Sequence, residues 1–424
     1  MSPDARSTQG ADAPRSPGPP LSDVRWLEYL RERPDLVAAA AERGNAPAEQ
    51  AALRKEHPAE AVAAALTLAE LRGRAVEKFR LGDRMWFDRV RLEQATGEAV
   101  ARHKARRFAA RMNAGEPGAS APGGNGSPVL DLCGGLGGDA IALAEFVPVR
   151  TVDRDPVAGW MATQNAALHG VSDRVTAETA SAEEVNVSGA FVHLDPDRRP
   201  GGERGAKRRE KRLEDYAPDL SFMRSLAASA AGGAIKVSPA SNWGGKFPDC
   251  EIELISHGGE CREATVWFGS LADPGVHRAT VLLDDDTHTL AADPFAAIPT
   301  VGPIADYLYD PDPSVVRAGL VDELCERTGL QRLDDAEEYL TGPRVETPFA
   351  TAFRVLAVCP NNARRYRAAI GETGAGDVEV KCRHLPTDAA AVRRKLPLTP
   401  GGPRRTLIFA KLEGKAAAVV CERA

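Results

Sequence analysis

The sequence has no long apolar run, and this absence limits the kinds of protein that it can encode. A membrane-spanning helix needs a run of about eighteen apolar residues, and no apolar run in the 424 residues is nearly that long. No apolar segment preceded by basic residues opens the chain, so we expect no secretory leader, no membrane partner and a cytoplasmic location. Residues 1–20 are rich in Pro, Ser, Gly and Ala, a composition that predicts a disordered tail.

Closely paired cysteines are also missing. The seven cysteines are spread through the chain without a C-x-x-C spacing, and the eight histidines are scattered, so the sequence predicts no metal site. Thiols of this kind, in a chain without an expected leader, fit a reduced cytosol. Cys133 differs from the others because it lies in a glycine-rich motif.

The chain lacks a strong net charge, since the formal value is −6. The distribution is uneven, however. Residues 303–360 contain five basic and eleven acidic side chains, whereas residues 361–424 contain thirteen basic and six acidic ones. The second segment could meet phosphates, or it could be an ordinary solvated surface.

Apolar periodicity divides the chain into segments. Residues 21–112 show the three- and four-residue spacing of helices, and residues 113–127 form a Gly/Pro/Ser/Ala linker. In residues 128–302, short apolar runs (PVLDLC, VRTVD, AFVHLD, AIKVS) alternate with helix-length segments, which is typical of a doubly wound α/β sheet. Three closely spaced runs (EIELISH, REATVWFG, HRATVLLD) then predict antiparallel strands at one edge.

Residues 303–424 read as a separate α+β module. We expect helices at 313–328 and 349–356, a strand in DVEVKCR, a helix in AAAVRRKL, and two final strands. The chain shows no internal repeat.

The run VLDLCGGLGGD, residues 129–139, ends the first strand of the α/β region and opens a helix at about Ala140. A nucleoside-bearing cofactor would lie over this edge of the sheet, where glycine allows close approach of the backbone and the helix N-terminus offers unpaired N–H groups. The predicted contacts to the cofactor come from Asp131, Cys133, Gly134, Gly135, Gly137 and Gly138.

Two acids favour S-adenosylmethionine over a dinucleotide, although the glycine spacing also satisfies a loose dinucleotide fingerprint. Asp131 precedes the glycines, where it would repel a pyrophosphate but could hold an ammonium group directly or through water. Asp153 ends the next strand and could accept hydrogen bonds from both ribose hydroxyls. Alternatively, Asp153 could cap a turn before Pro156, a role that Asp155 could fill instead.

The predicted acceptor side begins with the Asp195–Pro196 pair, which follows the fourth strand at the expected ligand crevice. A rigid Asp–Pro could hold the methyl acceptor, or it could be a simple turn. Arg198 and Arg199 open a basic stretch suited to phosphate, and Lys236 follows on the next strand. These three basic residues are the predicted substrate contacts.

These motifs resemble those of class I S-adenosylmethionine-dependent methyltransferases. DLCGGLGGD, VDRDP with Asn165, and LDP carry the resemblance, and the glycine-rich part is similar to the trimethylguanosine-synthase-like and other RNA-modifying branches. LEQATGEAVARHKARRF, ADYLYDPDPSVVRAGLVDEL, TPFATAFRVL and VEVKCR resemble a bacterial group that ends in a THUMP-like domain. The resemblance implies a Rossmann-like sheet with an N-terminal helical region and a C-terminal THUMP-like domain.

This sequence departs from the family pattern in two places. Amino-directed nucleic-acid enzymes usually carry an acid, Asn or Ser, followed by Pro-Pro and an aromatic residue. Here Asp195–Pro196 is followed by Asp197 and Arg198, without the aromatic residue. Trp160, Tyr216 or Trp243 could stack on a base instead. Where an acid often meets the adenine amino group this chain has Ser181, which could replace it.

The leading hypothesis is therefore an RNA methyltransferase, acting on tRNA or rRNA. The alternatives are a methyltransferase for a small molecule or a protein, and a non-catalytic RNA- or nucleotide-binding protein. A nicotinamide-dependent oxidoreductase fits Asp131 poorly. The sequence does not specify the oligomeric state or the acceptor atom.

Overall fold

A computed structural model describes residues 21–44, 46–113, 127–198, 212–284 and 286–424. The predicted tail, and the predicted linker apart from its two end residues, lie outside these ranges. The chain divides into two compact units, Met1–Asn186 and Val187–Ala424. None of the helices within the described ranges has both the length and the apolar character needed to cross a bilayer.

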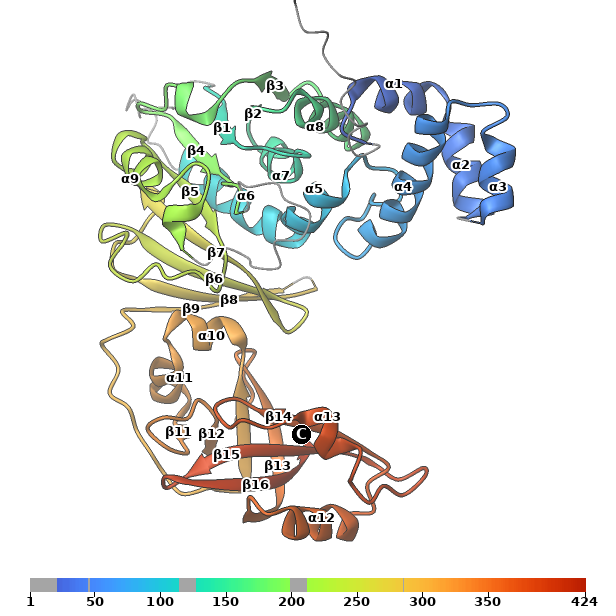
Figure 1. Cartoon of the computed structure of the whole chain (residues 1–424). Coiled ribbons are helices and arrows are strands. Elements are labelled where there is room, and N and C mark those ends of the chain that lie inside the picture. The colour runs from blue at the N-terminus through green and yellow to red at the C-terminus, as the bar shows by residue number, and fades with distance from the viewer. Residues whose placement is uncertain (1–20, 45, 114–126, 199–211, 285) are drawn as a thin grey trace, which may run out of the picture. The chain divides into compact units, whose positions relative to one another are not determined.

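Helices open the first unit, over the segment where the sequence predicts them. They are α1 (Val24–Glu32), α2 (Pro34–Arg43), α3 (Pro47–Leu53), α4 (Ala59–Ala75), α5 (Arg89–Gln94) and α6 (Glu98–Asn113). The Ala- and Leu-rich α4 packs against α1 and α2 (Figure 1). One apolar core joins their buried side chains to Leu136 and Met161 of the α/β region.

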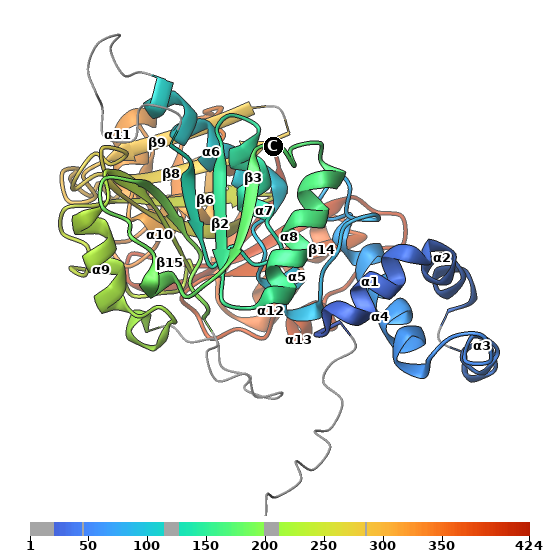
Figure 2. The ribbon, with the colours of Figure 1, turned by 90° about the horizontal axis from the view of Figure 1, so that it is seen from above.

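The first unit continues with strands and helices in alternation. They are β1 (Val129–Leu132), α7 (Gly138–Ala144), β2 (Val149–Asp153), α8 (Pro156–Leu168), β3 (Val175–Thr179) and the short 3-10 helix η1 (Ala182–Glu184). β1 pairs with β2 and β2 with β3, both in parallel. α8 lies along β2 and β3 (Figure 2). The carboxyl ends of these strands therefore share one edge of the sheet.

The second unit begins with β4 (Phe191–Leu194), the short 3-10 helix η2 (Leu213–Asp215), α9 (Leu220–Ser229) and β5 (Gly232–Val237). It then forms β6 (Glu251–His257), β7 (Glu260–Gly269), β8 (His277–Leu283) and β9 (Asp286–Ala292). β4 and β5 are parallel. Among the described residues, nine strands follow the order β3-β2-β1-β4-β5-β7-β6-β8-β9. This is the predicted doubly wound sheet.

The added edge differs from the prediction in one pairing. β7 is antiparallel to β6, and β9 is antiparallel to β8, as their short connections favour. β7 is also antiparallel to β5. β6 and β8, however, are parallel. In the sheet order, β7 and β8 lie on opposite sides of β6. The segment after β7 therefore crosses to the other side of β6, and β8 then runs in the same direction as β6.

The rest of the second unit forms the predicted α+β module. Its strands are β10 (Tyr307–Pro311), β11 (Gln331–Arg332), β12 (Leu340–Gly342), β13 (Ala350–Pro360), β14 (Asp377–Cys382), β15 (Arg404–Leu412) and β16 (Lys415–Arg423). Its helices are α10 (Pro313–Ala318), α11 (Val321–Thr328), α12 (Ala363–Glu372) and α13 (Ala389–Arg393). Within the described ranges the seven strands follow the order β11-β12-β10-β13-β16-β15-β14.

Both faces of this second sheet are apolar, because successive side chains of a strand point to opposite faces. Leu407 and Phe409 join one cluster with Tyr366 and Ile370 of α12. Ile408 and Ala410 join the cluster on the other face. α12 packs against β13 and β16 (Figure 1).

The helix expected at residues 349–356 is wrong, because this segment lies mostly in β13. Ala and Leu favour a helix locally, but β13 pairs in antiparallel fashion with β10 on one side and β16 on the other. Hydrogen bonds to two partner strands distant in sequence override the local preference.

Candidate active site

The loop after β1 turns sharply to start α7. The φ angles of this loop explain why it contains glycines. Cys133, Gly135 and Gly137 have positive φ angles of 59°, 56° and 84°, a region that glycine enters without steric cost. The helix begins at Gly138, two residues before the predicted start, and Gly137 is its N-cap.

Close packing, rather than backbone conformation, requires glycine at position 134. A Cβ at this position would lie 1.9 Å from Thr151 Oγ1 and 2.7 Å from Asp131 Oδ2. Thr151 Oγ1 donates a hydrogen bond of 2.9 Å to Asp131 Oδ2, and Asp131 is fully buried. Asp131 in β1 is therefore bonded to Thr151 in β2, and the glycine loop packs on this pair of side chains.

Asp153, at the end of β2, holds the loop from the other side. Its Oδ2 accepts the N–H of Gly135 at 3.0 Å, and its Oδ1 accepts the N–H of Asp155 at 2.9 Å. Burial raises the pKa of the Asp153 carboxyl, although these two N–H groups and Arg91 oppose the shift. The result is a partly buried carboxylate in a fixed orientation beside the glycine loop.

Asp155, not Asp153, caps α8. Its Oδ1 accepts the N–H of Val157 at 2.9 Å, and its other oxygen pairs with Arg91. The Arg91 guanidinium also pairs with Asp88. The capping role that the sequence offered to either acid therefore belongs to Asp155.

Ser181 follows β3 and precedes η1. Its hydroxyl donates a hydrogen bond to Glu183, while the preceding residue, Ala180, donates its N–H to the carbonyl of Asp153 at 3.1 Å. The backbone at Ser181 is thereby connected to the end of β2, but the Ser181 side chain is engaged with Glu183.

In the second unit, Asp195 and Lys236 form an ion pair. Lys236 Nζ lies 2.7 Å from Asp195 Oδ2, and the exposed fractions of the two side chains are 7% and 24%. Asp195 directly follows β4, while Lys236 is the fifth residue of β5. The ammonium group fixes the carboxylate at the carboxyl end of two parallel strands.

The segment after Pro196 is held by backbone contacts. Pro196 is buried, and Asp197 exchanges two backbone hydrogen bonds with Ala217, at 2.7 and 2.9 Å. The neighbouring Tyr216 is also buried, and its hydroxyl lies 2.8 Å from Ser241 Oγ. The loops after β4 and β5 are thus joined.

Similarity to known proteins identifies the enzyme class. Residues 126–224 match the model of RNA cap guanine-N2 methyltransferases, and residues 350–423 match the model of THUMP-like domains. Two uncharacterized S-adenosylmethionine-dependent methyltransferases of Mycobacterium tuberculosis, from strains CDC 1551 and H37Rv, are each 33% identical to this chain over 354 residues. Each match covers 80% of this chain and 90% of the relative.

The chain belongs to the S-adenosylmethionine-dependent methyltransferases.

The fold of this methyltransferase also matches a solved structure. A candidate methyltransferase of Porphyromonas gingivalis W83 is similar with a TM-score of 0.71 and 19% identity, over 92% of this chain and 99% of that one. The predicted fold class is confirmed, including the THUMP-like C-terminal domain.

The residues of the first unit suit S-adenosylmethionine, the cofactor of the family. Each oxygen of Asp153 accepts one backbone N–H, and a carboxylate oxygen has capacity for a further donor such as a ribose hydroxyl. A Cβ at Gly135 would meet no atom within 4 Å, so the loop faces open space there. The Asp153 and Gly135 contacts make this loop the site we expect for the nucleoside.

The predicted cofactor contacts fall into two groups in the methyltransferase. Gly135 faces open space and donates its N–H to Asp153, so these two contacts stay predictions that the geometry allows. Asp131, Gly134 and Gly137 have clear packing roles, since a Cβ at Gly137 would lie 3.0 Å from Ala162. The other predicted contacts, Cys133, Gly138 and Ser181, remain predictions.

On the substrate side, the structure describes only part of the prediction. Arg198 is partly buried, but Arg199 and the rest of the basic stretch, through Lys211, lie outside the described residues. Trp160 packs edge-to-face on Trp86, with ring centroids 5.0 Å apart, so this indole has a structural partner. Trp243 remains as a partly buried aromatic side chain.

Sequence reasoning missed Thr151 and Arg91, which orient the acids of the site. No motif reveals them, because their roles depend on contacts across strands and between distant segments. Asn165, quoted above for its resemblance to the family, is fully buried and donates a hydrogen bond of 3.0 Å to the carbonyl of Leu136 in the glycine loop. Its position in α8 ties that loop to the helix.

Proposed function

We propose that this methyltransferase modifies RNA, and that Asp195 and Pro196 orient the acceptor while Lys236 positions Asp195. The observation that carries the assignment is the 2.7 Å pair between Lys236 and Asp195. An ammonium group that is almost fully buried holds its partner in one place, as an orienting carboxylate requires.

Each unit supports its own part of the assignment. Ligands of open α/β sheets bind at the carboxyl ends of the strands, and Asp153 ends β2 in the first unit, whereas Asp195 directly follows β4 in the second. We therefore assign Asp153 to the cofactor and Asp195 to the acceptor.

Bound S-adenosylmethionine supplies an electrophilic methyl group on a sulfonium sulfur. Transfer of this methyl group would be an in-line displacement at the methyl carbon, so the main contribution of the protein would be to align the acceptor. If the methyl acceptor is a nitrogen that carries an N–H group, Asp195 can accept a hydrogen bond from that group. Its carboxylate can then stabilise the positive charge that develops on the nitrogen. Pro196 restricts the backbone that presents this carboxylate.

Two features support RNA as the substrate. The family models matched by residues 126–224 and 350–423 are those of RNA cap guanine-N2 methyltransferases and THUMP-like domains. In the THUMP-like domain, basic side chains at α12 and near α13 are exposed and form no ion pair with any described residue: Arg364, Arg365, Arg394 and Lys395. Helices α12 and α13 contribute to one apolar cluster, so they cover the same face of the sheet.

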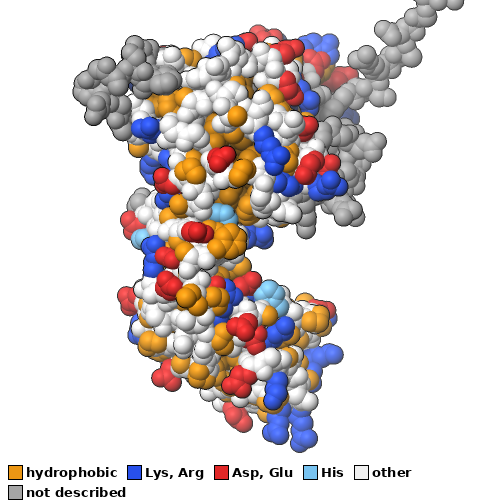
Figure 3. Space-filling view, turned by 90° about the vertical axis from the view of Figure 1, so that its left-hand side faces the viewer, with side chains coloured by type: hydrophobic (Ala, Val, Ile, Leu, Met, Phe, Trp, Pro, Cys, Tyr) orange, Lys and Arg blue, Asp and Glu red, His pale blue; other side chains and the backbone are white. Residues whose placement is uncertain are grey.

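Some of the other basic side chains of this domain are paired with acids. Arg393 pairs with Asp377, and Arg354 and Arg405 pair with Glu422. Acidic and basic side chains are interspersed on the face shown in Figure 3. The four exposed cations at α12 and near α13 contribute to the basic excess of residues 361–424 and are suited to phosphate.

The first test is calorimetric titration with S-adenosylmethionine. We expect binding that Asp153→Ala removes, whereas the exposed Asp173→Ala in the same unit retains it. The second test measures transfer of a labelled methyl group to total RNA and to RNA transcribed in vitro. We expect label in RNA, and we expect Asp195→Ala to bind the cofactor but lose transfer.

Label in proteins or small molecules, but not in RNA, would favour the alternative methyltransferase. Cofactor binding without transfer to any fraction would favour a non-catalytic RNA-binding protein, for which Asp197 and Arg198 in place of the usual motif are the supporting observation.

A further inference from the structure

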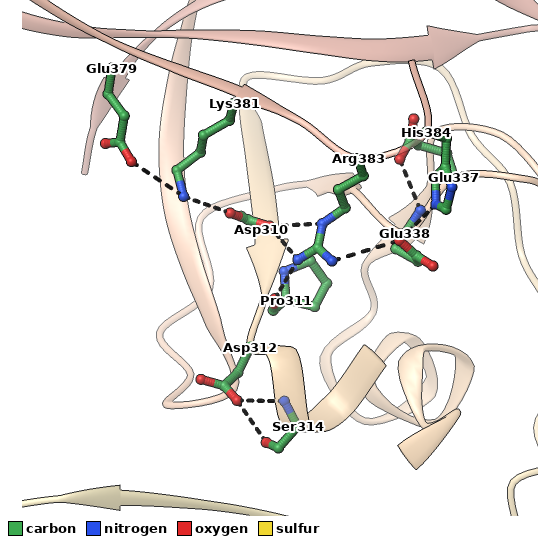
Figure 4. Close-up of polar contacts among 10 residues, drawn as sticks. All are labelled: Asp310, Pro311, Asp312, Ser314, Glu337, Glu338, Glu379, Lys381, Arg383 and His384. Atoms are coloured by element: carbon green, nitrogen blue, oxygen red, sulfur yellow. Dashed lines mark hydrogen bonds and ion pairs between the residues drawn. The ribbon is translucent and has the colours of Figure 1, made fainter. Parts of the chain in front are cut away.

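Two distant segments of the THUMP-like domain bring a histidine and two glutamates together. Glu337 and Glu338 lie in the loop between β11 and β12, and His384 follows β14. One ligand atom from each side chain lies within 4.8 Å of the others. Figure 4 shows the three side chains converging from these two segments.

Glu337 is a buried carboxylate without a cationic partner. It is fully buried, its Oε1 accepts the N–H of Glu338 at 3.1 Å, and its Oε2 accepts the N–H of Lys411 at 3.0 Å. No lysine, arginine or histidine in the described ranges forms an ion pair with it. Because a buried charge is stable only when paired or bound to a metal, its surroundings suit an added cation.

The nearby arginine and lysine are bound to another acid. Arg383 donates to Asp310 Oδ1 at 2.6 and 3.1 Å, and to the carbonyl of Pro311 at 2.9 Å. Lys381 donates to Asp310 Oδ2 at 2.9 Å. Arg383 approaches Glu338 only to 3.7 Å. Asp310 therefore binds both cations closely, and Arg383 also reaches Glu338 in a longer ion pair (Figure 4).

His384 completes the donor set from the solvent side. Its Nε2 lies 2.8 Å from Glu338 Oε2, and its side chain is 41% exposed. It is the single histidine among residues 303–424. An ion from solution could therefore reach the site. Binding or release of that ion would change the surroundings of a single imidazole, that of His384.

We propose that Glu337, Glu338 and His384 bind a divalent transition-metal ion of the zinc type. Two carboxylates and a neutral imidazole bring a charge of −2, which such an ion neutralises. The imidazole favours zinc-like ions over calcium or magnesium, which prefer oxygen ligands. Three protein ligands leave a fourth position for water or an oxygen of a phosphate.

The ion would join the loop before β12 to the end of β14, which are not paired in the sheet. This proposal departs from the sequence-based expectation of no metal. The sequence could not reveal it, because 46 positions separate Glu338 from His384 and only the fold brings them together.

The test uses the full chain, stripped with a chelator and titrated with Zn²⁺ by calorimetry and with Co²⁺ by visible absorption. We expect one bound ion with an oxygen- and nitrogen-liganded cobalt spectrum. His384→Ala and Glu338→Gln should each weaken binding by at least about tenfold, the lower end of what even an outer-shell change costs. Circular dichroism checks that both variants fold, and the half-exposed His384 tolerates truncation.

The controls separate this site from other ligands. His288→Ala, in β9, should bind the ion as the unmodified protein does, and Cys382→Ser excludes the neighbouring thiol. The proposal is overturned if the protein binds no ion, if binding survives His384→Ala, or if cobalt shows thiolate charge transfer that Cys382→Ser removes.

Discussion

Asn165 holds the backbone of Trp86 with two hydrogen bonds, although 79 positions separate them. Its Oδ1 accepts the N–H of Trp86 at 2.8 Å, and its Nδ2 donates to the carbonyl of Trp86 at 2.9 Å. The same amide reaches the glycine loop through Leu136. One side chain therefore couples the helical segment, α8 and the cofactor loop.

Replacing Asn165 should destabilise the protein and weaken cofactor binding together. Asn165→Ala leaves buried N–H and C=O groups without partners, each at a cost of about 1–3 kcal/mol. We expect the free energy of unfolding, measured by urea titration, to fall by at least about 2 kcal/mol. The neighbouring Gln164→Ala should change it by less than about 0.5 kcal/mol, and equal effects of the two variants would contradict this role.

Glycine 134 should be sensitive to a single added methyl group. Gly134→Ala places a Cβ on Thr151 Oγ1, so the hydrogen bond from Thr151 to Asp131 must break or shift. We expect a loss of about 1–3 kcal/mol and weaker binding of S-adenosylmethionine. Gly73→Ala in α4 is the control, because its Cβ would meet nothing within 4 Å and alanine favours a helix by about 1 kcal/mol. Destabilisation by both variants would argue against the packing explanation.

Lys236→Met should separate binding from transfer. The side chain keeps its length but loses the charge that orients Asp195, so methyl transfer should fall by at least about tenfold, equivalent to about 1.4 kcal/mol. The cofactor affinity should stay within about twofold. Lys246→Met is a matched control, since Lys246 pairs with Glu214 at 2.8 Å. Unchanged transfer in Lys236→Met would remove this lysine from the site.

Cysteine reactivity should depend on pH in a predictable direction. Burial raises the pKa of Cys250 and Cys325 to about 11, and that of Cys421 to about 12. Because the thiolate is the reactive form, these residues stay protonated at pH 8, and their reactivity should rise as the pH approaches these values. Mass spectrometry after alkylation at pH 8 should find all three unmodified in the native protein and modified after denaturation. Rapid native alkylation of Cys421 would contradict the burial.

The exposed cations of the THUMP-like domain should contribute to the salt dependence of RNA binding. The double variant Arg364→Ser/Arg365→Ser removes two charges from the start of α12. If both meet phosphates, the slope of log K against log salt should become shallower by about 1.4–1.8. Arg344→Ser, at an arginine whose side chain is 65% exposed, serves as the control. An unchanged slope in the double variant would place the RNA elsewhere.

Much of the fold could be predicted from local patterns. The alternation of buried runs with helix-length segments predicted β1, β2, β4 and β5, because parallel strands covered on both faces are apolar throughout. Pairing between strands that are distant in the sequence was harder to predict. β13 and the parallel contact of β6 with β8 depend on partners that local composition does not specify.

The candidate site shows the same division. The residue types after each strand indicated the cofactor, since Asp153 and the glycine loop must occupy defined positions at a strand end. The residues that hold these acids in place could not be predicted from the sequence. Thr151 contacts Asp131 across two strands, and Arg91 reaches Asp155 from a helix 64 positions earlier.

The position of β7 between β5 and β6 also affects the chain during its synthesis. β5 ends at Val237, and its partner strand ends at Gly269, so the 32 residues from Ser238 to Gly269 must be made before this pairing is complete. At about 5–20 residues per second, the ribosome needs roughly 2 to 6 s for them. During that interval one side of a strand that is fully buried in the folded protein has open N–H and C=O groups, a template for pairing with other chains. The nascent protein is therefore most vulnerable to aggregation after its cofactor loop is complete and before β7 emerges.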